Sequence, residues 1–215
     1  PLCDKPDVLQ TGDLTTLNKK RASEQETWNF IRKDIDTSCD MYAGLEYGNY
    51  NGANCYWNKA ASQCLKAEVY LWGAKVKPIG GTGVLSPDPA GDLQAAKAAL
   101  EEVEPHYSYN AKFADAFSPK DKDANPETIF AARYMLNEST NYFVNFTYNI
   151  AIFTKYFDAE GNKIGNVLNI GSGYMRYEYS QAFYDSFEEG DTRRDATFLQ
   201  FYLKNTDNEL YPAGR

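Results

Sequence analysis

Aromatic rings and polar side chains gather between Asn137 and Tyr179, and together they have the chemistry needed to hold a sugar. A pyranose packs the C–H groups of one face on a flat ring, while its hydroxyl groups need planar donors and acceptors. We therefore predict a glycan-binding surface; for any single ring, packing in the core under the loop is the alternative. The predicted contacts are Asn141, Tyr142, Phe143, Tyr148, Tyr156, Tyr174, Arg176 and Tyr177.

Catalytic motifs are weak in this sequence. The single histidine, His106, follows Pro105 in a predicted turn and has no obvious nucleophile to serve, and no G-x-S-x-G motif is present. Glu188, Glu189 and Asp191 lie close together, but acidic residues are so frequent here that the pattern favours a solvated helix end. We expect no catalytic residue and no enzyme. A glycoside hydrolase fragment is an alternative only if two carboxylates converge at roughly 5–10 Å.

Metal and phosphate motifs are incomplete. The sequence Asp121-x-Asp123-x-Asn125 matches the start of a calcium loop, but Pro126 and Ala132 stand where that loop needs Gly and Glu. A hydrated acidic turn is the favoured interpretation, with a weak calcium site as the alternative. The four cysteines have no C-x-x-C spacing, and the glycine-rich residues 80–83 have no following Lys-Ser or Lys-Thr. We therefore expect no metal and no cofactor.

The overall charge disfavours polyanionic partners. Among 215 residues, 22 are basic and 30 acidic, so the net charge is −8. This sign repels nucleic acid and anionic membrane surfaces. No apolar run reaches the roughly 18 residues of a spanning helix. The sequence begins at Pro1 and ends in a polar stretch, so we expect a piece of a longer protein with its signal and anchor outside these residues.

Three helices are predicted in the first half. Ser23 and Glu26 form a capping box before a helix that we expect to end at Gly44. The helical period resumes over residues 57–72, on a face that includes Trp57, Leu71 and Trp72, and again over residues 92–103. The turn-forming residues 47–52 and the Pro/Gly-rich residues 75–91 are predicted loops.

Shorter elements are predicted after Pro105. We expect a helical turn at residues 113–117, a buried strand or extended segment at residues 128–134, and a helix from Ser180 to Gly190. Residues 198–203 could form a strand, and residues 205–215 show no closing element. The fold class is therefore mainly α.

Five segments, in order, resemble the SusD/RagB family. The most specific is the helix over residues 57–72, whose Lys59-Ala60-Ala61 and Val69-Tyr70-Leu71 are similar to the family's K-A-A-x-x-L-x-A-x-V-Y-L pattern. Residues 125–130 look like its N-x-E-x-I-F stretch. Residues 187–194 are similar to its F-x-x-G-D-x-R segment, in which we expect Asp191 and Arg193 to form a buried pair. Residues 28–39 and 92–103 look like the flanking helices.

The resemblance implies a fold, a role and a location. It implies tetratricopeptide-like helix pairs, a long irregular, aromatic-rich loop region and few short strands, all within one domain of which residues 1–215 are a fragment. Residues 20–118 would be the helical scaffold and residues 119–215 the ligand-facing part. It also implies non-catalytic capture of oligo- or polysaccharides at the outer-membrane surface of Bacteroidetes, with delivery to a SusC-like TonB-dependent transporter. Any membrane association would run through a lipid anchor outside this chain.

Two departures and two rival functions accompany this resemblance. The loop over residues 75–91 is longer than the usual family connection. Ligand contacts vary within the family, so none is transferred to this sequence. A helical-repeat adaptor that binds protein is one rival, and a family member that binds peptide is the other.

Overall fold

The computed structural model describes residues 2, 15, 18–118, 122–134, 138, 155–165, 179–198 and 201–214. The chain divides into two compact units, which are described separately. Unit 1 comprises Pro1–Asn110 and Pro119–Ala132, and unit 2 comprises Ala111–Ser118 and Arg133–Arg215. Within the described residues, no helix is both long and apolar enough to span a membrane.

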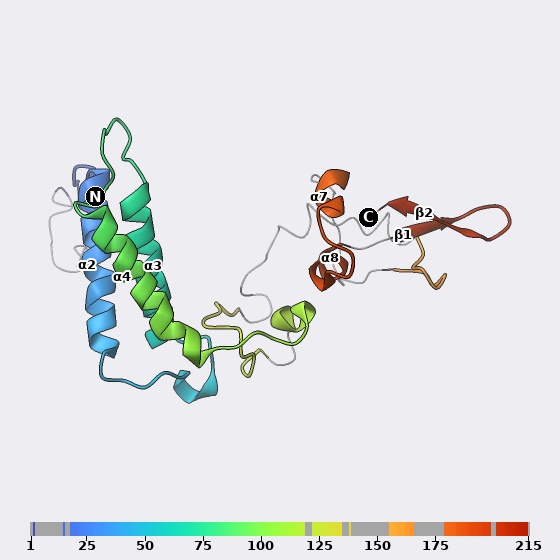
Figure 1. Cartoon of the computed structure of the whole chain (residues 1–215), viewed down its shortest axis with the longest axis horizontal. Helices are drawn as coiled ribbons and strands as arrows, with labels where there is room; N and C mark the ends of the chain where they lie inside the picture. The colour runs from blue at the N-terminus through green and yellow to red at the C-terminus, as the bar shows by residue number, and fades with distance from the viewer. Residues whose placement is uncertain are drawn as a thin grey trace. The chain divides into compact units, whose positions relative to one another are not determined.

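The described part of unit 1 is built on three α-helices that run up and down beside one another: α2 (Glu24–Tyr42), α3 (Lys59–Lys75) and α4 (Pro89–Val103) (Figure 1). The central helix, α3, packs against both neighbours. Alanines at the contacts let the backbones approach closely. The buried core consists of Ile35, Cys39, Ala67, Val69, Tyr70, Ala96 and Ala99. The prediction of a mainly helical fold built from helix pairs is confirmed.

The start of α2 follows the predicted capping box. The Ser23 hydroxyl accepts a hydrogen bond from the Glu26 backbone N–H at 3.1 Å, and the Ser23 N–H donates to the Glu26 carboxylate at 2.8 Å. Two N–H groups that the first turn would leave unpaired are satisfied in this way. The helix ends at Tyr42, two residues before the predicted Gly44.

The predicted starts of α3 and α4 were wrong by a few residues. Asn58 caps α3 by accepting from the Ala61 N–H at 2.9 Å, so the helix begins at Lys59. Asp88 caps α4 through the Gly91 N–H, and α4 begins at Pro89 rather than Asp92. Proline is tolerated at the first helical position because its missing N–H would have had no helical partner there.

Polar contacts join α2 to α4 and to α3. Arg32 on α2 forms a two-pronged ion pair with Asp92 on α4, with both N···O distances at 2.9 Å. The Trp28 indole N–H donates to the Val69 carbonyl on α3 at 3.2 Å. Gly73 makes room for that indole, because a Cβ there would lie 2.2 Å from a Trp28 ring carbon.

The predicted inner face of α3 was partly wrong. Leu71 and Trp72 are exposed, and Trp57 lies outside the helix. Most of the residues that α3 buries are small, because the helix is covered on two sides. The buried residues are Ala60, Ala61, Ser62, Ala67, Val69, Tyr70, Gly73 and Ala74. Size, rather than hydrophobicity alone, decides which residues face the neighbouring helices.

The connecting segments of unit 1 lie before α3 and after α4. The loop before α3 contains the short helix η2 (Tyr50–Gly52), and α4 runs into η3 (Glu104–His106). Residues 128–134 form no strand and are not buried, so the prediction of a buried strand was wrong: Phe130 and Tyr134 are 40% and 66% exposed. Within unit 1, the Ala131 N–H donates to the Asn54 carbonyl of the loop at 3.0 Å.

Unit 2 contains short elements: η4 (Phe113–Phe117), α7 (Gln181–Asp185), α8 (Thr192–Thr197), β1 (Phe201–Lys204) and β2 (Leu210–Gly214). The two strands pair antiparallel as a hairpin (Figure 1). The predicted turn at residues 113–117 and a strand within residues 198–203 are confirmed. The helix after Ser180 ends at Asp185 instead of Gly190, and neither α8 nor β2 was predicted.

The Asp–Arg pair of residues 191 and 193 forms, but it is not buried. Asp191 caps α8 by accepting from the Arg193 N–H, and its carboxylate also pairs with the Arg193 guanidinium at 2.6 Å. The Arg193 side chain is 63% exposed. Hydrogen bonds from Arg193 lower the pKa of Asp191, which favours the charged cap.

Candidate functional site

Two hollows in unit 1 differ in chemistry. The first, here called the helix groove, lies along α2 and α3 and has a volume of about 690 Å³. The second, here called the Tyr47 pocket, has a volume of about 290 Å³ and lies between the loop before α3, the turn after α4 and residues 123–128.

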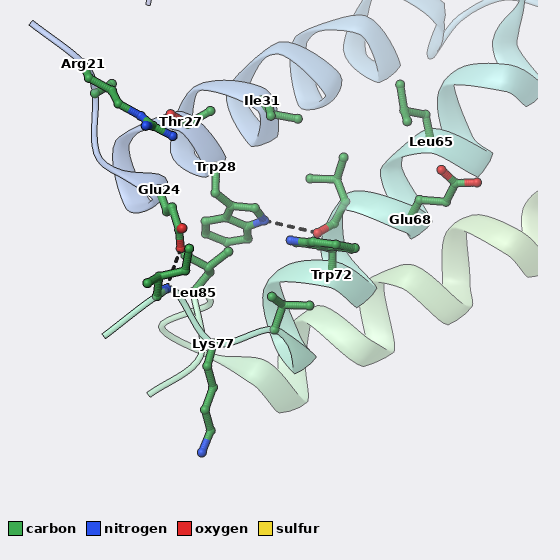
Figure 2. Close-up of a pocket in the computed structure, with 14 residues that line it drawn as sticks. Arg21, Glu24, Thr27, Trp28, Ile31, Leu65, Glu68, Trp72, Lys77 and Leu85 are labelled. Carbon is green, nitrogen blue, oxygen red and sulfur yellow. Dashed lines mark hydrogen bonds between the residues drawn. The ribbon is translucent and has the colours of Figure 1, made fainter. Parts of the chain in front are cut away.

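The helix groove is mainly apolar, with a few charged side chains along it (Figure 2). Its main lining residues are Trp28, Ile31, Leu65, Val69, Trp72 and Leu85. Two of its polar groups already have partners within the protein: the Trp28 N–H donates to the Val69 carbonyl, and the Glu24 carboxylate accepts from the Ile79 N–H at 2.9 Å. Arg21, Glu68 and Lys77 also border the groove, but its largely apolar wall mainly fits apolar side chains.

The Tyr47 pocket combines rings with short polar side chains. Its lining residues are Tyr47, Gly48, Asn49, His106, Tyr107, Ser108, Asp123, Ala124, Asn125, Pro126 and Thr128. Amides, hydroxyls and a carboxylate therefore stand beside aromatic faces, which is the combination that a pyranose needs. The volume lies near the lower end of the roughly 300–1,000 Å³ of small-molecule sites, so it suits one unit of a polymer rather than a long stretch.

Tyr47 is held in place by charged groups. Its hydroxyl donates to the Glu102 carboxylate at 2.8 Å, and the other oxygen of that carboxylate accepts from Gln63 at 2.9 Å. The Lys59 ammonium lies 4.6 Å from the centre of the Tyr47 ring and 3.5 Å from Glu102. Burial and the hydrogen bond to Glu102 raise the pKa of Tyr47 above its usual value of 10. The phenol therefore stays protonated and keeps donating.

The imidazole of His106 stacks on the Tyr47 ring. The ring centres are 3.9 Å apart, and the planes are 13° from parallel. His106 is an exposed residue of η3, so this pair presents a flat aromatic surface at the edge of the pocket. The structure thus gives the single histidine a partner, which the sequence had not shown.

Asparagines tie the walls of the pocket together. Asn58 is buried, and its side-chain N–H donates to the Ile129 carbonyl at 3.0 Å and to Asn49 at 3.3 Å. Asn54, also buried, donates to the Lys122 carbonyl at 2.7 Å. These bonds join the loop before α3 to residues 122–130, so the pocket has fixed walls.

A second set of hydrogen bonds, made by Asn110, holds the wall of the pocket that contains Asn125. The Asn110 side chain donates to Asn125 and to Glu127, each at 2.9 Å, and the Asn110 backbone N–H also donates to Glu127. These hydrogen bonds lower the pKa of Glu127, which therefore remains ionised and keeps accepting.

Exposed rings extend the surface beside the pocket. Tyr50 and Tyr56 are 66% and 48% exposed and meet edge to face, with ring centres 5.3 Å apart. Trp57 is also exposed; its ring meets Phe130 at 5.3 Å, and its N–H donates to the Ser62 hydroxyl at 2.7 Å. Rings fixed by such contacts can accept a flat ligand with little loss of side-chain entropy.

Most of the predicted glycan contacts lie outside the described residues: Asn141, Tyr142, Phe143, Tyr148, Tyr174, Arg176 and Tyr177. Tyr156 is described. It belongs to unit 2, is half-buried, and packs on Phe201 with ring centres 4.4 Å apart. The prediction of these contacts stays a prediction.

The calcium-like motif falls partly in the Tyr47 pocket. Asp121 lies outside the described residues, whereas Asp123 and Asn125 line the pocket. The Asn125 side-chain oxygen accepts from Asn110 at 2.9 Å and from the Glu127 N–H at 3.0 Å, so it serves the framework. In the part of the chain that the structure describes, no group of three or more His, Cys, Asp or Glu side chains could hold a metal ion.

The sequence had not pointed to the Tyr47 pocket as a site. The available signal was the loop over residues 47–52, in which tyrosines alternate with turn-forming Gly and Asn. Tyrosines in such a loop are well placed to face a ligand. The missing information was that His106 and Asn125, far along the chain, complete the same hollow.

Comparisons with known proteins agree with the sequence resemblance. No protein-family model matches the chain, and no curated protein matches it. Among solved structures, it is similar to a SusD superfamily protein from Bacteroides fragilis, with 35% identity and a TM-score of 0.73 over 93% of this chain. A SusD superfamily protein from Bacteroides vulgatus has the same fold, with a TM-score of 0.63 over 87% of this chain at 23% identity. The chain spans 41% and 38% of the lengths of these proteins. By this likeness, the chain belongs to the SusD superfamily.

Proposed function

We propose that this protein captures glycans without cleaving them and that the Tyr47 pocket holds one sugar unit. The observation that carries the proposal is the stacked Tyr47–His106 pair beside the amide and hydroxyl groups of the same hollow. The ring pair offers a face for C–H groups, and Asn49, Ser108 and Thr128 offer hydrogen-bonding groups for hydroxyls. Membership of the SusD superfamily supports a glycan as the ligand.

The exposed rings beside the pocket would bind neighbouring units of the polymer. Tyr50 and Tyr56 stand on the same loop as Tyr47 and expose much of their rings. Several weak stacking contacts give moderate affinity with fast release, which suits a protein that binds a polymer and hands it over.

Among the residues that line the Tyr47 pocket, Asp123 alone carries a carboxylate, and the two carboxylates next to the lining are held by hydrogen bonds, which supports a binding role rather than hydrolysis. Glu102 is engaged by Tyr47 and Gln63, and Glu127 is engaged by Asn110. Both serve as fixed acceptors in the framework of the pocket. Cleavage of a glycosidic bond would need an acid and a second carboxylate that both reach the bond.

The location and partner follow from the family and are part of the proposal. The protein would act at the surface of the outer membrane, held by a lipid anchor outside these residues, and would deliver its glycan to a SusC-like TonB-dependent transporter. The predicted contacts between Asn141 and Tyr177, together with Tyr156, would form a second glycan-contacting surface in unit 2.

The test is a binding screen of the natural full-length protein against a panel of polysaccharides in affinity gels, with release of sugar products assayed in parallel. We expect retardation by at least one polysaccharide and no product. We also expect His106→Ala to weaken retardation. Phe117→Ala is the matched control, because Phe117 is an exposed ring of unit 2 outside the pocket.

Other outcomes would favour the rivals. Product release would contradict the non-catalytic role. Absence of retardation on every polysaccharide would favour peptide cargo or a protein-binding adaptor. Retardation that His106→Ala leaves unchanged would place the glycan elsewhere, and Tyr156→Ala would then test the unit 2 surface.

A further inference from the structure

Asn49 stands at the N-cap position of η2, but its side chain does not cap that helix. Asparagine at such a position ordinarily accepts a hydrogen bond from one of the first backbone N–H groups of the helix. Here the Asn49 side-chain oxygen accepts instead from the side chain of Asn58, at 3.3 Å. The Asn49 amide, which lines the Tyr47 pocket, is therefore oriented by a contact outside η2.

Two backbone groups decide which way the Asn58 amide faces. The Ala61 N–H donates to the Asn58 side-chain oxygen at 2.9 Å, and the Ile129 carbonyl accepts from the Asn58 NH₂ group at 3.0 Å. A backbone N–H can only donate and a carbonyl can only accept, so the two ends of this amide cannot be exchanged. Asn58 is only 4% exposed, so these contacts determine its orientation. Asn58 therefore donates to Asn49, and Asn49 meets it with its oxygen.

The NH₂ group of Asn49 is left to donate to a ligand. Because the oxygen of this amide faces Asn58, the NH₂ group on the other branch is turned away from Asn58. In the part of the chain that the structure describes, this NH₂ group makes no hydrogen bond. Asn49 is half-buried, so a sugar oxygen can reach the group. A donor that is already oriented loses little entropy when a ligand binds.

The charges around the Tyr47 pocket determine the class of sugar that fits. Its described lining residues include the carboxylate of Asp123 but neither Lys nor Arg. The Lys59 ammonium, next to Tyr47, is already paired with Glu102 at 3.5 Å. A sugar unit that carries a carboxylate or sulfate would bring a negative charge to a wall that holds one already, whereas an uncharged unit needs only neutral donors and acceptors.

We propose that Asn49 determines specificity in the Tyr47 pocket by donating its NH₂ group to a hydroxyl or acyl oxygen of an uncharged sugar unit, and that Asn58 is the positioning residue that orients it. This assignment rests on the proposed capture of glycans at the Tyr47 pocket. It adds the direction of one hydrogen bond and the class of sugar: neutral units bind in this pocket, and uronic acid or sulfated units do not.

The test is Asn49→Asp in the natural full-length protein. A carboxylate at position 49 still accepts from Asn58, so the contact within the protein is kept while the donor is lost. Asn29→Asp is the matched control, because the Asn29 oxygen also accepts from a side-chain amide, that of Gln25 at 3.1 Å, on an exposed part of α2 outside the pocket. Both substitutions add one negative charge.

The neutral probes are amylopectin, galactomannan and xyloglucan, and the acidic probe is polygalacturonate. The Kd is measured for the neutral polymer that retards the natural protein most in affinity gels. We expect Asn49→Asp to raise this Kd about tenfold or more with an unchanged Tm, and Asn29→Asp to change it by less than about twofold. We expect polygalacturonate to cause no retardation that depends on His106.

Three outcomes would overturn the proposal, and they are distinguishable. An unchanged Kd for Asn49→Asp, in a protein whose Kd rises on His106→Ala, would refute the donor role of Asn49 and leave the pocket as a glycan site. Retardation by polygalacturonate that His106→Ala abolishes would refute the class of sugar. If no neutral probe is bound, or if His106→Ala has no effect, the proposed function of the pocket is wrong and this assignment falls with it. If Asn49→Asp does not fold, Asn49→Ala replaces it, with Asn29→Ala as its control.

Discussion

Tyr47 and His106 stack face to face although one precedes α3 and the other follows α4. Tyr47 is held through its hydroxyl by Glu102, a residue of α4 itself, so the helix that ends next to His106 also positions its partner. The stack therefore depends on the packing of α3 against α4. A change that loosens these helices should disturb the pocket as well as the core.

The ring of Tyr50 should contribute to glycan binding. Replacing Tyr50 by alanine removes an exposed stacking face from the loop that lines the pocket. We expect the Kd for a bound glycan to rise about fivefold to tenfold, equivalent to about 1–1.4 kcal/mol. Isothermal titration calorimetry checks this, with Phe117→Ala as the control. An unchanged Kd for Tyr50→Ala would remove this ring from the site.

The Arg32–Asp92 ion pair should be important for stability. The Asp92 side chain is only 5% exposed, and the Arg32 guanidinium also lies 4.3 Å from the centre of the Tyr70 ring. Arg32→Met leaves a buried carboxylate unpaired, and we expect it to lower the free energy of unfolding by about 2–4 kcal/mol. Urea unfolding followed by circular dichroism measures the change.

The exposed pair of Lys97 and Glu101 on α4 supplies the control. Lys97→Met should change the free energy of unfolding by about 0.5 kcal/mol or less, because exposed ion pairs contribute little. Equal effects of the Arg32 and Lys97 substitutions would show that burial of Asp92 does not matter.

Any side chain at position 73 should destabilise the protein. An alanine Cβ there would lie 2.2 Å from the buried ring of Trp28, so the indole or the helix must move. We expect Gly73→Ala to cost about 1–3 kcal/mol of unfolding free energy. Gly44→Ala is the matched control, since beyond that residue and its two chain neighbours no atom lies within 4 Å of a Cβ at that position. A neutral Gly73→Ala would contradict the close packing of α2 on α3.

The capping box makes the stability of α2 depend on pH. Hydrogen bonds from the backbone N–H and the hydroxyl of Ser23 lower the pKa of Glu26 below 4.5. Because the folded-state pKa is the lower one, this stabilisation is present above about pH 4.5 and is lost as pH falls through the folded value. Glu26→Gln should therefore be less stable than the natural protein at pH 7, and the difference should shrink below pH 4.5. A difference in Tm that is constant from pH 7 to pH 3 would contradict this.

Local signals predicted the helices well where one short segment determines them. The capping box of Ser23 and Glu26 correctly placed the start of α2, because both hydrogen bonds lie within one turn. The start of α4 was missed for a local reason: the Pro/Gly-rich residues 75–91, which include Pro89, were predicted to be a loop, whereas Asp88 caps the helix and proline suits its first position.

Features that depend on distant segments were not predictable in the same way. The exposure of Trp72 depends on which sides of α3 are covered by α2 and α4. The periodicity of apolar residues alone does not show which sides these are. The Tyr47 pocket needs residues 47–49, 106–108 and 123–128 to meet, and buried Asn58 joins the first and last of these segments. The aromatic content pointed to residues 141–177, of which the structure describes Tyr156 among the predicted contacts.

The most direct test of the account is the affinity of the full-length protein for the polysaccharide that retards it most, measured for the natural protein and for His106→Ala, with product release assayed in the same samples. We predict binding without products and a Kd at least about fivefold higher for the variant, with unchanged Tm. Sugar release, or an equal Kd for both proteins, would contradict non-catalytic capture at the Tyr47 pocket.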